Sequence, residues 1–152
     1  MSNPDPLLRT CTEDLNDSKI PVKRDGRRAT FDNSGRATIK RVDLDCWIQS
    51  ADSVKADFIV AKPGVVDIIV ELKGRDIAHA VEQIVATLVT WRKVPPLSTR
   101  IGGLIVFTRC PMRAAEIGDA KKRLLVKHGL WMEMDKDQKT EYRFETFAGK
   151  RA

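Results

Sequence analysis

"VVDIIVELKG", residues 65 to 74, is an apolar stretch that carries charges at three places. Asp67 interrupts its first half, and Glu71 and Lys73 follow two residues apart near its end. Side chains of a strand alternate between the two faces of a sheet, so these three residues share one face. A charged row on so apolar a strand indicates a solvated edge, a structural ion pair or a functional site.

The composition is that of a folded protein with one domain. The chain has 152 residues, of which 42% are hydrophobic and 32% charged, enough for a single hydrophobic core. No apolar run approaches the roughly 20 residues that cross a membrane, and the first residues lack a signal-peptide pattern. We therefore expect a cytoplasmic protein with no membrane association.

The three cysteines, Cys11, Cys46 and Cys110, lie far apart and form no CxxC pair. This spacing is typical neither of a zinc site nor of a disulfide framework. We expect reduced cysteines that serve as packing residues.

The formal net charge of +6 is compatible with a polyanionic partner. Basic residues concentrate between residues 23 and 41, where only Asp25 and Asp32 oppose them. Such a run forms either a flexible, solvated arm or a surface that follows phosphates.

Two parts follow one another along the chain. Residues 1 to 35 are polar, and we expect a partly flexible N-terminal segment with one short helix near residues 7 to 15. Residues 36 to 148 predict an α/β domain. Its expected strands and helices, in order, are strands over 37–48, 56–61 and 65–73, a helix over 76–94, a strand over 101–108, a helix over 110–129 that ends at Gly129, and one or two strands within 130–147. This order predicts a single domain with a central mixed sheet flanked by helices.

The second and third strands predict a hairpin, because "KPG" at 62–64 is a turn signal. If residues 62–66 form the loop, Ala61 pairs with Asp67, and Asp57 lies opposite Glu71 on the same face. A register shifted by one residue would separate the two acids.

Two adjacent carboxylates repel one another, and a divalent cation such as Mg²⁺ or Mn²⁺ relieves the repulsion. Lys73, one strand step further, would then orient or deprotonate a water molecule or neutralise charge on a phosphate.

Asp57, the "ELK" of residues 71–73 and the helix "HAVEQIVATL" together resemble the PD-(D/E)XK nuclease superfamily. The resemblance covers roughly residues 37 to 135 and is greatest to small Holliday-junction-resolvase-like members. It implies a restriction-endonuclease-like fold and metal-dependent hydrolysis of nucleic acid, with DNA favoured over RNA. Asp57 and Glu71 would hold Mg²⁺ or Mn²⁺, Lys73 would assist the water, and Gln83 would join the catalytic site.

The chain departs from the family pattern in two respects. Ala56 stands where the family has Pro, and no clear acid precedes the sheet. Glu13 is the best candidate for that acid, with Asp43 and Asp45 as alternatives.

Nucleic acid would contact four basic residues, Arg28, Lys40, Arg41 and Arg75. An enzyme of this size that cuts two strands would act as a homodimer. Two other functions stay open: a nuclease-fold protein that binds nucleic acid without cutting it, and a module that binds an acidic protein partner.

Overall fold

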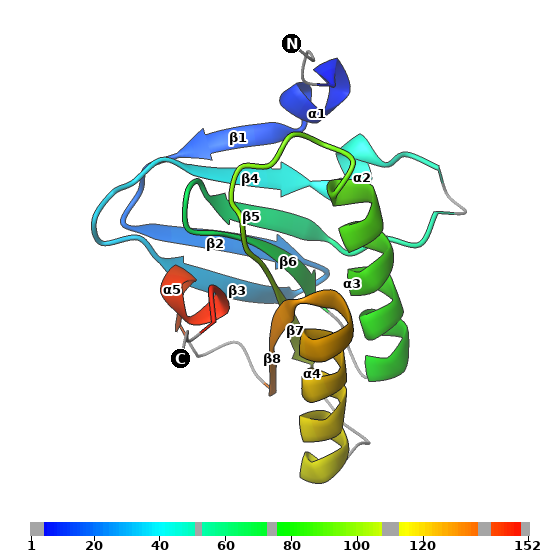
Figure 1. Cartoon of the computed structure of the whole chain (residues 1–152). Helices are drawn as coiled ribbons and strands as arrows, with labels where there is room; N and C mark the ends of the chain where they lie inside the picture. Colours follow the sequence, from blue (N-terminus) through cyan, green and yellow to red (C-terminus); the bar gives the residue numbers. More distant parts are fainter. Residues whose placement is uncertain (1–4, 51–52, 73–75, 108–112, 137–140, 150–152) are drawn as a thin grey trace.

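The computed structural model describes residues 5–50, 53–72, 76–107, 113–136 and 141–149. These residues form a six-stranded sheet, a three-stranded sheet and five helices in one α/β domain (Figure 1).

The larger sheet has the strand order β1-β4-β5-β6-β7-β8. Its strands are β1 (Thr12–Leu15), β4 (Ile39–Asp43), β5 (Phe58–Lys62), β6 (Val66–Leu72), β7 (Ile101–Phe107) and β8 (Leu130–Lys136). Within this order, β1, β4, β5 and β6 pair antiparallel with their neighbours, and β6, β7 and β8 pair parallel. The predicted mixed sheet is therefore confirmed. Every residue of β6 is buried, which explains why its sequence is almost continuously apolar.

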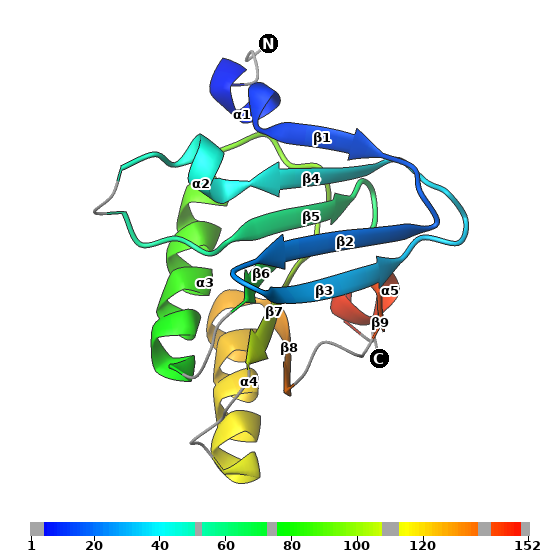
Figure 2. The same ribbon diagram turned by 180° about the vertical axis from the view of Figure 1, so that it is seen from behind.

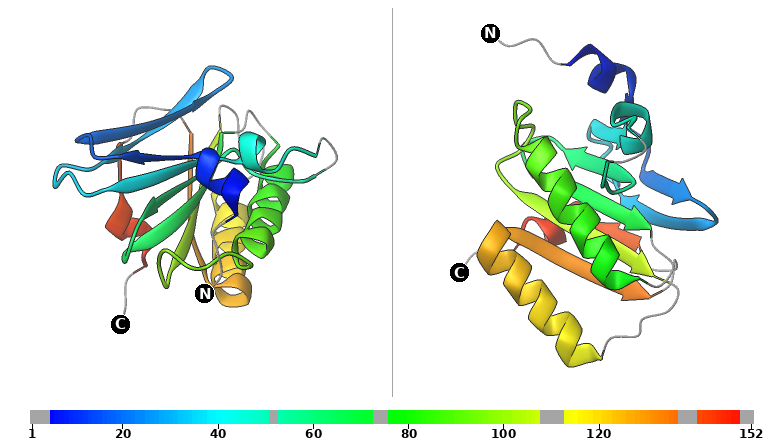
Figure 3. Two further views of the ribbon diagram at one scale, coloured as in Figure 1. Left: turned by 90° about the horizontal axis from the view of Figure 1, so that it is seen from above. Right: turned by 90° about the vertical axis from the view of Figure 1, so that its right-hand side faces the viewer.

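Helices α3 (Ile77–Trp91) and α4 (Ala114–His128) cover one face of this sheet (Figure 3). The apolar residues of α3 recur at helical spacing, and those facing the sheet are buried in one core. Helix α4 ends at Gly129, which adopts the left-handed conformation (φ 69°) expected of a C-terminal cap. Among the described helices, none has both the length and the apolarity needed to cross a membrane.

A second layer covers the opposite face of the sheet (Figure 3). It consists of β2 (Lys19–Arg24), β3 (Arg27–Asp32), β9 (Glu141–Arg143) and helix α5 (Phe144–Phe147). The turn between β2 and β3 is Asp25-Gly26, both with positive φ (52° and 77°), as a tight two-residue hairpin requires. Strand β9 pairs in parallel with β3, so the C-terminal part of the chain completes a sheet begun near the N-terminus.

The prediction of a loosely structured segment over residues 1–35 is wrong for residues 12–32. These residues form β1, β2 and β3, and Ile20, Val22 and Phe31 are buried in the second core. Apolar and basic side chains alternate along β2 and β3. The segment is therefore polar on average, and for this reason the sequence pattern did not predict these strands. The expected helix near residues 7–15 is confined to α1 (Pro6–Thr10).

Two short helices replace parts of expected strands. The strand predicted over 37–48 stops at Asp43, because the Asp43 side chain accepts hydrogen bonds from the backbone N–H of Asp45 and Cys46 and begins helix α2 (Leu44–Trp47). Helix α5 likewise follows β9 directly, where a strand was predicted to continue.

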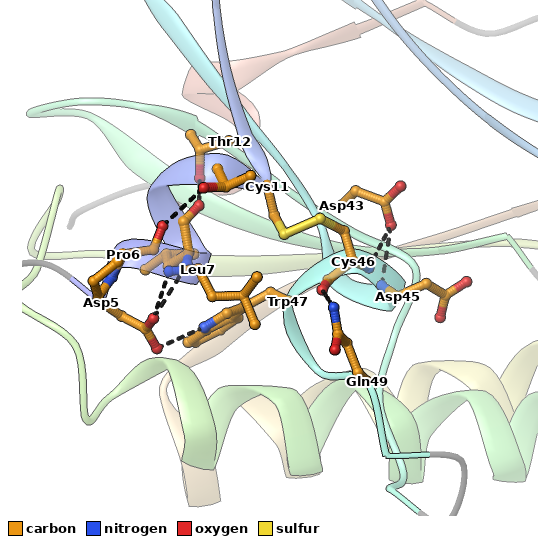
Figure 4. The surroundings of a disulfide bond; sticks show 12 residues. Asp5, Pro6, Leu7, Cys11, Thr12, Asp43, Asp45, Cys46, Trp47 and Gln49 are labelled. Carbon is orange, nitrogen blue, oxygen red and sulfur yellow. Dashed lines mark hydrogen bonds between the residues drawn. A yellow bond between two sulfur atoms is a disulfide. The ribbon is translucent and has the colours of Figure 1, made fainter.

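Cys11 and Cys46 form a disulfide bond, so the prediction of reduced cysteines is wrong for this pair (Figure 4). The bond joins the end of α1 to α2. The two residues lie 35 positions apart in the sequence, and they meet because β1 and β4 are neighbours in the sheet. Cys110 lies outside the described residues. The cysteines therefore give no support to the expectation of a cytoplasmic location.

Candidate functional site

The hairpin of β5 and β6 has the register expected from the sequence, with Ala61 paired to Asp67. Asp57 directly precedes β5. Its backbone N–H donates to the carbonyl of Val70 (3.0 Å), and its Oδ2 accepts from the backbone N–H of Leu72 (2.8 Å). These two bonds reach to either side of Glu71 and hold Asp57 beside it on the neighbouring strand.

Asp57 and Glu71 are shielded from water to different degrees. Glu71 is 3% exposed and Asp57 is half-buried. Burial raises the pKa of the Asp57 carboxyl, whereas the Leu72 N–H and the Arg24 guanidinium oppose this shift. Two acids enclosed at the end of an apolar hairpin exclude the interpretation of a solvated edge.

Arg24, at the end of β2, is a residue of this region that the sequence did not single out. Its guanidinium donates to Asp43 Oδ1 (3.0 Å), pairs with Asp45 and lies 4.6 Å from the ring centroid of Phe58. The tip of the β2–β3 hairpin thus lies against the end of β5 that carries Asp57 (Figure 2). "RDGR", residues 24–27, was the available signal, because a two-residue turn predicts a hairpin with arginines opposite one another.

Two polar residues of α3 hold the segment that leads into Asp57. Gln83 Nε2 donates to the carbonyl of Lys55 (2.9 Å), and Thr87 Oγ1 accepts from the N–H of Ala56 (2.8 Å) while donating to the carbonyl of Gln83 (2.8 Å). Both side chains therefore lie on the side of α3 that faces the segment before Asp57. Gln83 acts here through the backbone before Asp57, which is the geometry of a positioning residue.

Lys73, the predicted catalytic lysine, and Arg75, a predicted phosphate contact, lie outside the described residues. Within the part of the chain that the structure describes, no group of three or more His, Cys, Asp or Glu residues is arranged to hold a metal ion. An ion bound by Asp57 and Glu71 would therefore complete its coordination with water and with phosphate oxygens.

Two of the predicted nucleic-acid contacts are engaged in ion pairs across the edge of the sheet. Lys40 pairs with Asp14 (2.8 Å) and Arg41 with Glu13 (2.7 Å), each directly opposite its partner in the register. Glu13, the first candidate for an additional metal ligand, is therefore already paired with Arg41. The alternatives, Asp43 and Asp45, pair with Arg24.

Arg28, the third described residue of that predicted set, is exposed on β3 opposite the exposed Lys23 of β2. These two residues therefore present accessible positive charge one position from Arg24 and Arg27 of the same hairpin, in contrast to the paired cations of β4.

No protein-family model, no curated protein and no solved structure matches this chain. The resemblance to the nuclease superfamily therefore rests on the sequence motifs alone.

Proposed function

We propose that this chain is a metal-dependent nuclease that hydrolyses phosphodiester bonds, with DNA as the favoured substrate. Asp57 and Glu71 would hold Mg²⁺ or Mn²⁺, and Lys73 would assist the attacking water. The observation that carries the proposal is the pair of hydrogen bonds by which Asp57 reaches to either side of the buried Glu71. Acids that only make a surface soluble are exposed and are not held in a fixed geometry.

The donor set fits the proposed ion. Carboxylate oxygens are the ligands that Mg²⁺ and Mn²⁺ prefer. Burial raises the pKa of Asp57, and a bound divalent cation would lower it again by favouring the charged form. Such an ion would polarise the phosphate and activate a water molecule. Gln83 and Thr87 would fix the backbone before Asp57 and so hold one metal ligand in place.

The accessible charge of the β2–β3 hairpin supports a nucleic-acid partner. Lys23 and Arg28 are exposed near the tip of this hairpin, whose Arg24 lies close enough to Asp57 to oppose the rise in its pKa. Phosphate contacts of this kind are independent of sequence and weaken as salt rises. A homodimer that presents two such sites would account for cutting both strands of a duplex.

Cleavage of a small substrate panel with Mg²⁺ or Mn²⁺ tests the proposal: duplex DNA, single-stranded DNA, a four-way junction and structured RNA. We expect cutting that EDTA abolishes and that Asp57→Asn and Lys73→Ala each lower by about a hundredfold or more. Glu82→Gln, an exposed acid on the outer side of α3, is the matched control and should cut like the wild type. Cutting that persists in Asp57→Asn would reject this site.

A second function is favoured by the contacts of Arg24. Asp43 and Asp45 already have a counter-charge from this guanidinium, as expected of a nuclease-fold module that binds nucleic acid without cutting it. Salt-dependent DNA binding, no cleavage of any substrate and no rise in melting temperature with Mg²⁺ or Mn²⁺ would establish this alternative. In either case, replacing Lys23 and Arg28 together by Gln should weaken DNA binding and reduce its salt dependence.

A further inference from the structure

A cavity of about 810 Å³ lies at the other end of β6 from Asp57 and Glu71. It is bounded by the C-terminal ends of α3 and α4, the first residues of β7 and β8, and the residues that follow α5. Its size is that of a small-molecule site, and nothing in the proposed nuclease chemistry uses it.

The floor of the cavity contains a buried acid. Asp67 is 1% exposed, and its Oδ2 accepts a hydrogen bond from Trp91 Nε1 (2.8 Å). No donor of the described residues meets Oδ1 in hydrogen-bond geometry. Burial raises the pKa of this carboxyl, and the side chains of Trp91 and Ser98 oppose that rise. Ser98 lies nearby, but its hydroxyl donates to the carbonyl of Lys62 (3.2 Å). Buried polar atoms almost always have a partner, so this oxygen indicates a place for an additional donor.

The walls and the mouth supply two other kinds of group. Trp91 and Trp131 line the cavity, and Trp131, which is half-buried, offers an indole on which a planar ring can lie. At the mouth, Arg92 donates to the carbonyl of His128 (2.8 Å) and Arg100 to that of Ala148 (2.6 Å). A guanidinium carries five N–H donors. The carbonyl bond of each arginine uses one of them, so the other donors can bind an anionic group.

We propose that this cavity binds a purine nucleoside monophosphate that carries an exocyclic amino group. The amino group would donate to Asp67 Oδ1, the purine ring would lie against the indole of Trp131, and the phosphate would contact Arg92 and Arg100. Neither inorganic phosphate nor an aliphatic amine offers a ring to the indole. Because Oδ1 is covered, binding requires a small movement at the floor, and Ser98, held by one hydrogen bond, is the side chain that can give way.

Titration of the full chain with GMP, AMP, IMP and inorganic phosphate, followed by tryptophan fluorescence and calorimetry, tests this proposal. IMP is GMP without the exocyclic amino group. We expect saturable binding of GMP or AMP, weakened about tenfold or more for IMP and still weaker for inorganic phosphate.

Three variants locate the site. Asp67→Asn keeps the shape but removes the charged acceptor, and we expect it to weaken GMP or AMP binding about tenfold. Arg92→Gln replaces an exposed residue, so it should fold normally and still weaken binding of every phosphate-bearing ligand. Asp57→Asn, at the opposite end of β6, should bind as the wild type does, and this separates the cavity from the proposed nuclease site. The proposal is overturned by absence of saturable binding, by IMP binding as tightly as the tighter of GMP and AMP, or by loss of binding in Asp57→Asn with retention in Asp67→Asn and Arg92→Gln.

Discussion

The backbone N–H and carbonyl of Asp57 are both hydrogen-bonded, whereas burial disfavours the charged form of its carboxyl. Its N–H donates to the carbonyl of Val70 and its carbonyl accepts from the N–H of Leu44, so both polar groups of its main chain have partners. Its carboxyl accepts one backbone hydrogen bond, from Leu72, and burial raises its pKa. An acid whose pKa is higher in the folded than in the unfolded state binds its proton more tightly when the protein is folded. Its contribution to stability is fully present below the unfolded pKa of about 4 and is lost as the pH rises through the folded pKa.

Asp57→Asn should therefore flatten the pH dependence of stability. We expect the wild type to gain free energy of unfolding, relative to the variant, as the pH falls from neutral to about 4. Chemical denaturation of both proteins at a series of pH values measures this. Glu145→Gln is a control of opposite sign, because a hydrogen bond from Lys62 lowers the pKa of Glu145. Parallel curves for the wild type and Asp57→Asn would contradict the assignment of burial as the dominant effect.

At the scale of elements, helix α3 packs on the sheet with its apolar face and is also hydrogen-bonded, through Gln83 and Thr87, to the segment before β5. Thr87 is fully buried, and its hydroxyl is the hydrogen-bond partner of the Ala56 N–H. A valine at this position would fill the same space and leave that N–H unsatisfied.

Thr87→Val should lower the free energy of unfolding by about 1 to 3 kcal/mol, the cost of one buried donor without a partner. Thr90→Val is the matched control on the same helix. The Thr90 hydroxyl donates only to the carbonyl of Ala86 (3.4 Å), so its loss should change stability by no more than about 0.5 kcal/mol. Equal effects of the two substitutions would show that the hydroxyl of Thr87 is not what holds Ala56.

The disulfide attaches α1 and the edge strand β1 to α2. The Asp5 carboxylate adds a second link between α1 and α2, since it accepts from Trp47 Nε1 (3.0 Å; Figure 4). Closing a loop of 35 residues restricts the unfolded chain, an effect of about 3 to 4 kcal/mol in the chain-entropy description.

Replacing Cys11 and Cys46 together by Ser should lower the melting temperature in the oxidised protein by several degrees. A reductant should lower the melting temperature of the wild type and leave that of the double variant unchanged. Cys110→Ser should retain the response to reductant. A wild type insensitive to reductant would mean that the bond does not stabilise the fold.

The elements that could be predicted are those whose signals lie close together in the sequence. The β5–β6 hairpin follows from "KPG" between two apolar runs, and this turn sets the register that brings Asp57 to Glu71. Strands β2 and β3 were missed because their outward-facing side chains are basic. The contacts of Arg24, the ion pairs of Lys40 and Arg41, and the disulfide all depend on which strands become neighbours, and this information is not local.

At the scale of the whole molecule, the large sheet separates two hydrophobic cores. One lies under α3 and α4, and the other is enclosed by the β2–β3 hairpin and α5. Gly102 of β7 lies where the sheet meets α5. A Cβ atom at Gly102 would come within 2.8 Å of Phe147 Cβ and 2.9 Å of the Phe147 carbonyl oxygen.

Gly102→Ala should lower the free energy of unfolding by about 1 to 3 kcal/mol, because backbone atoms of α5 must move to admit the methyl group. Gly118→Ala is the control: a Cβ there meets nothing within 4 Å, and alanine should stabilise α4 by about 0.5 to 1 kcal/mol. Denaturation of both variants measures the difference. A neutral Gly102→Ala would show that α5 is free to shift away from the sheet.

The parallel pairing of β3 with β9 joins Thr30 to Glu141, and this has a consequence for how the chain emerges from the ribosome. When β2 and β3 have been synthesised, Tyr142, Phe144 and Phe147, which pack around Phe31, have not yet been translated. Phe31 of the nascent hairpin therefore lacks its aromatic neighbours until more than a hundred further residues have been synthesised. During that interval the exposed apolar surface can bind chaperones, and the second core closes only after Tyr142, Phe144 and Phe147 have been synthesised.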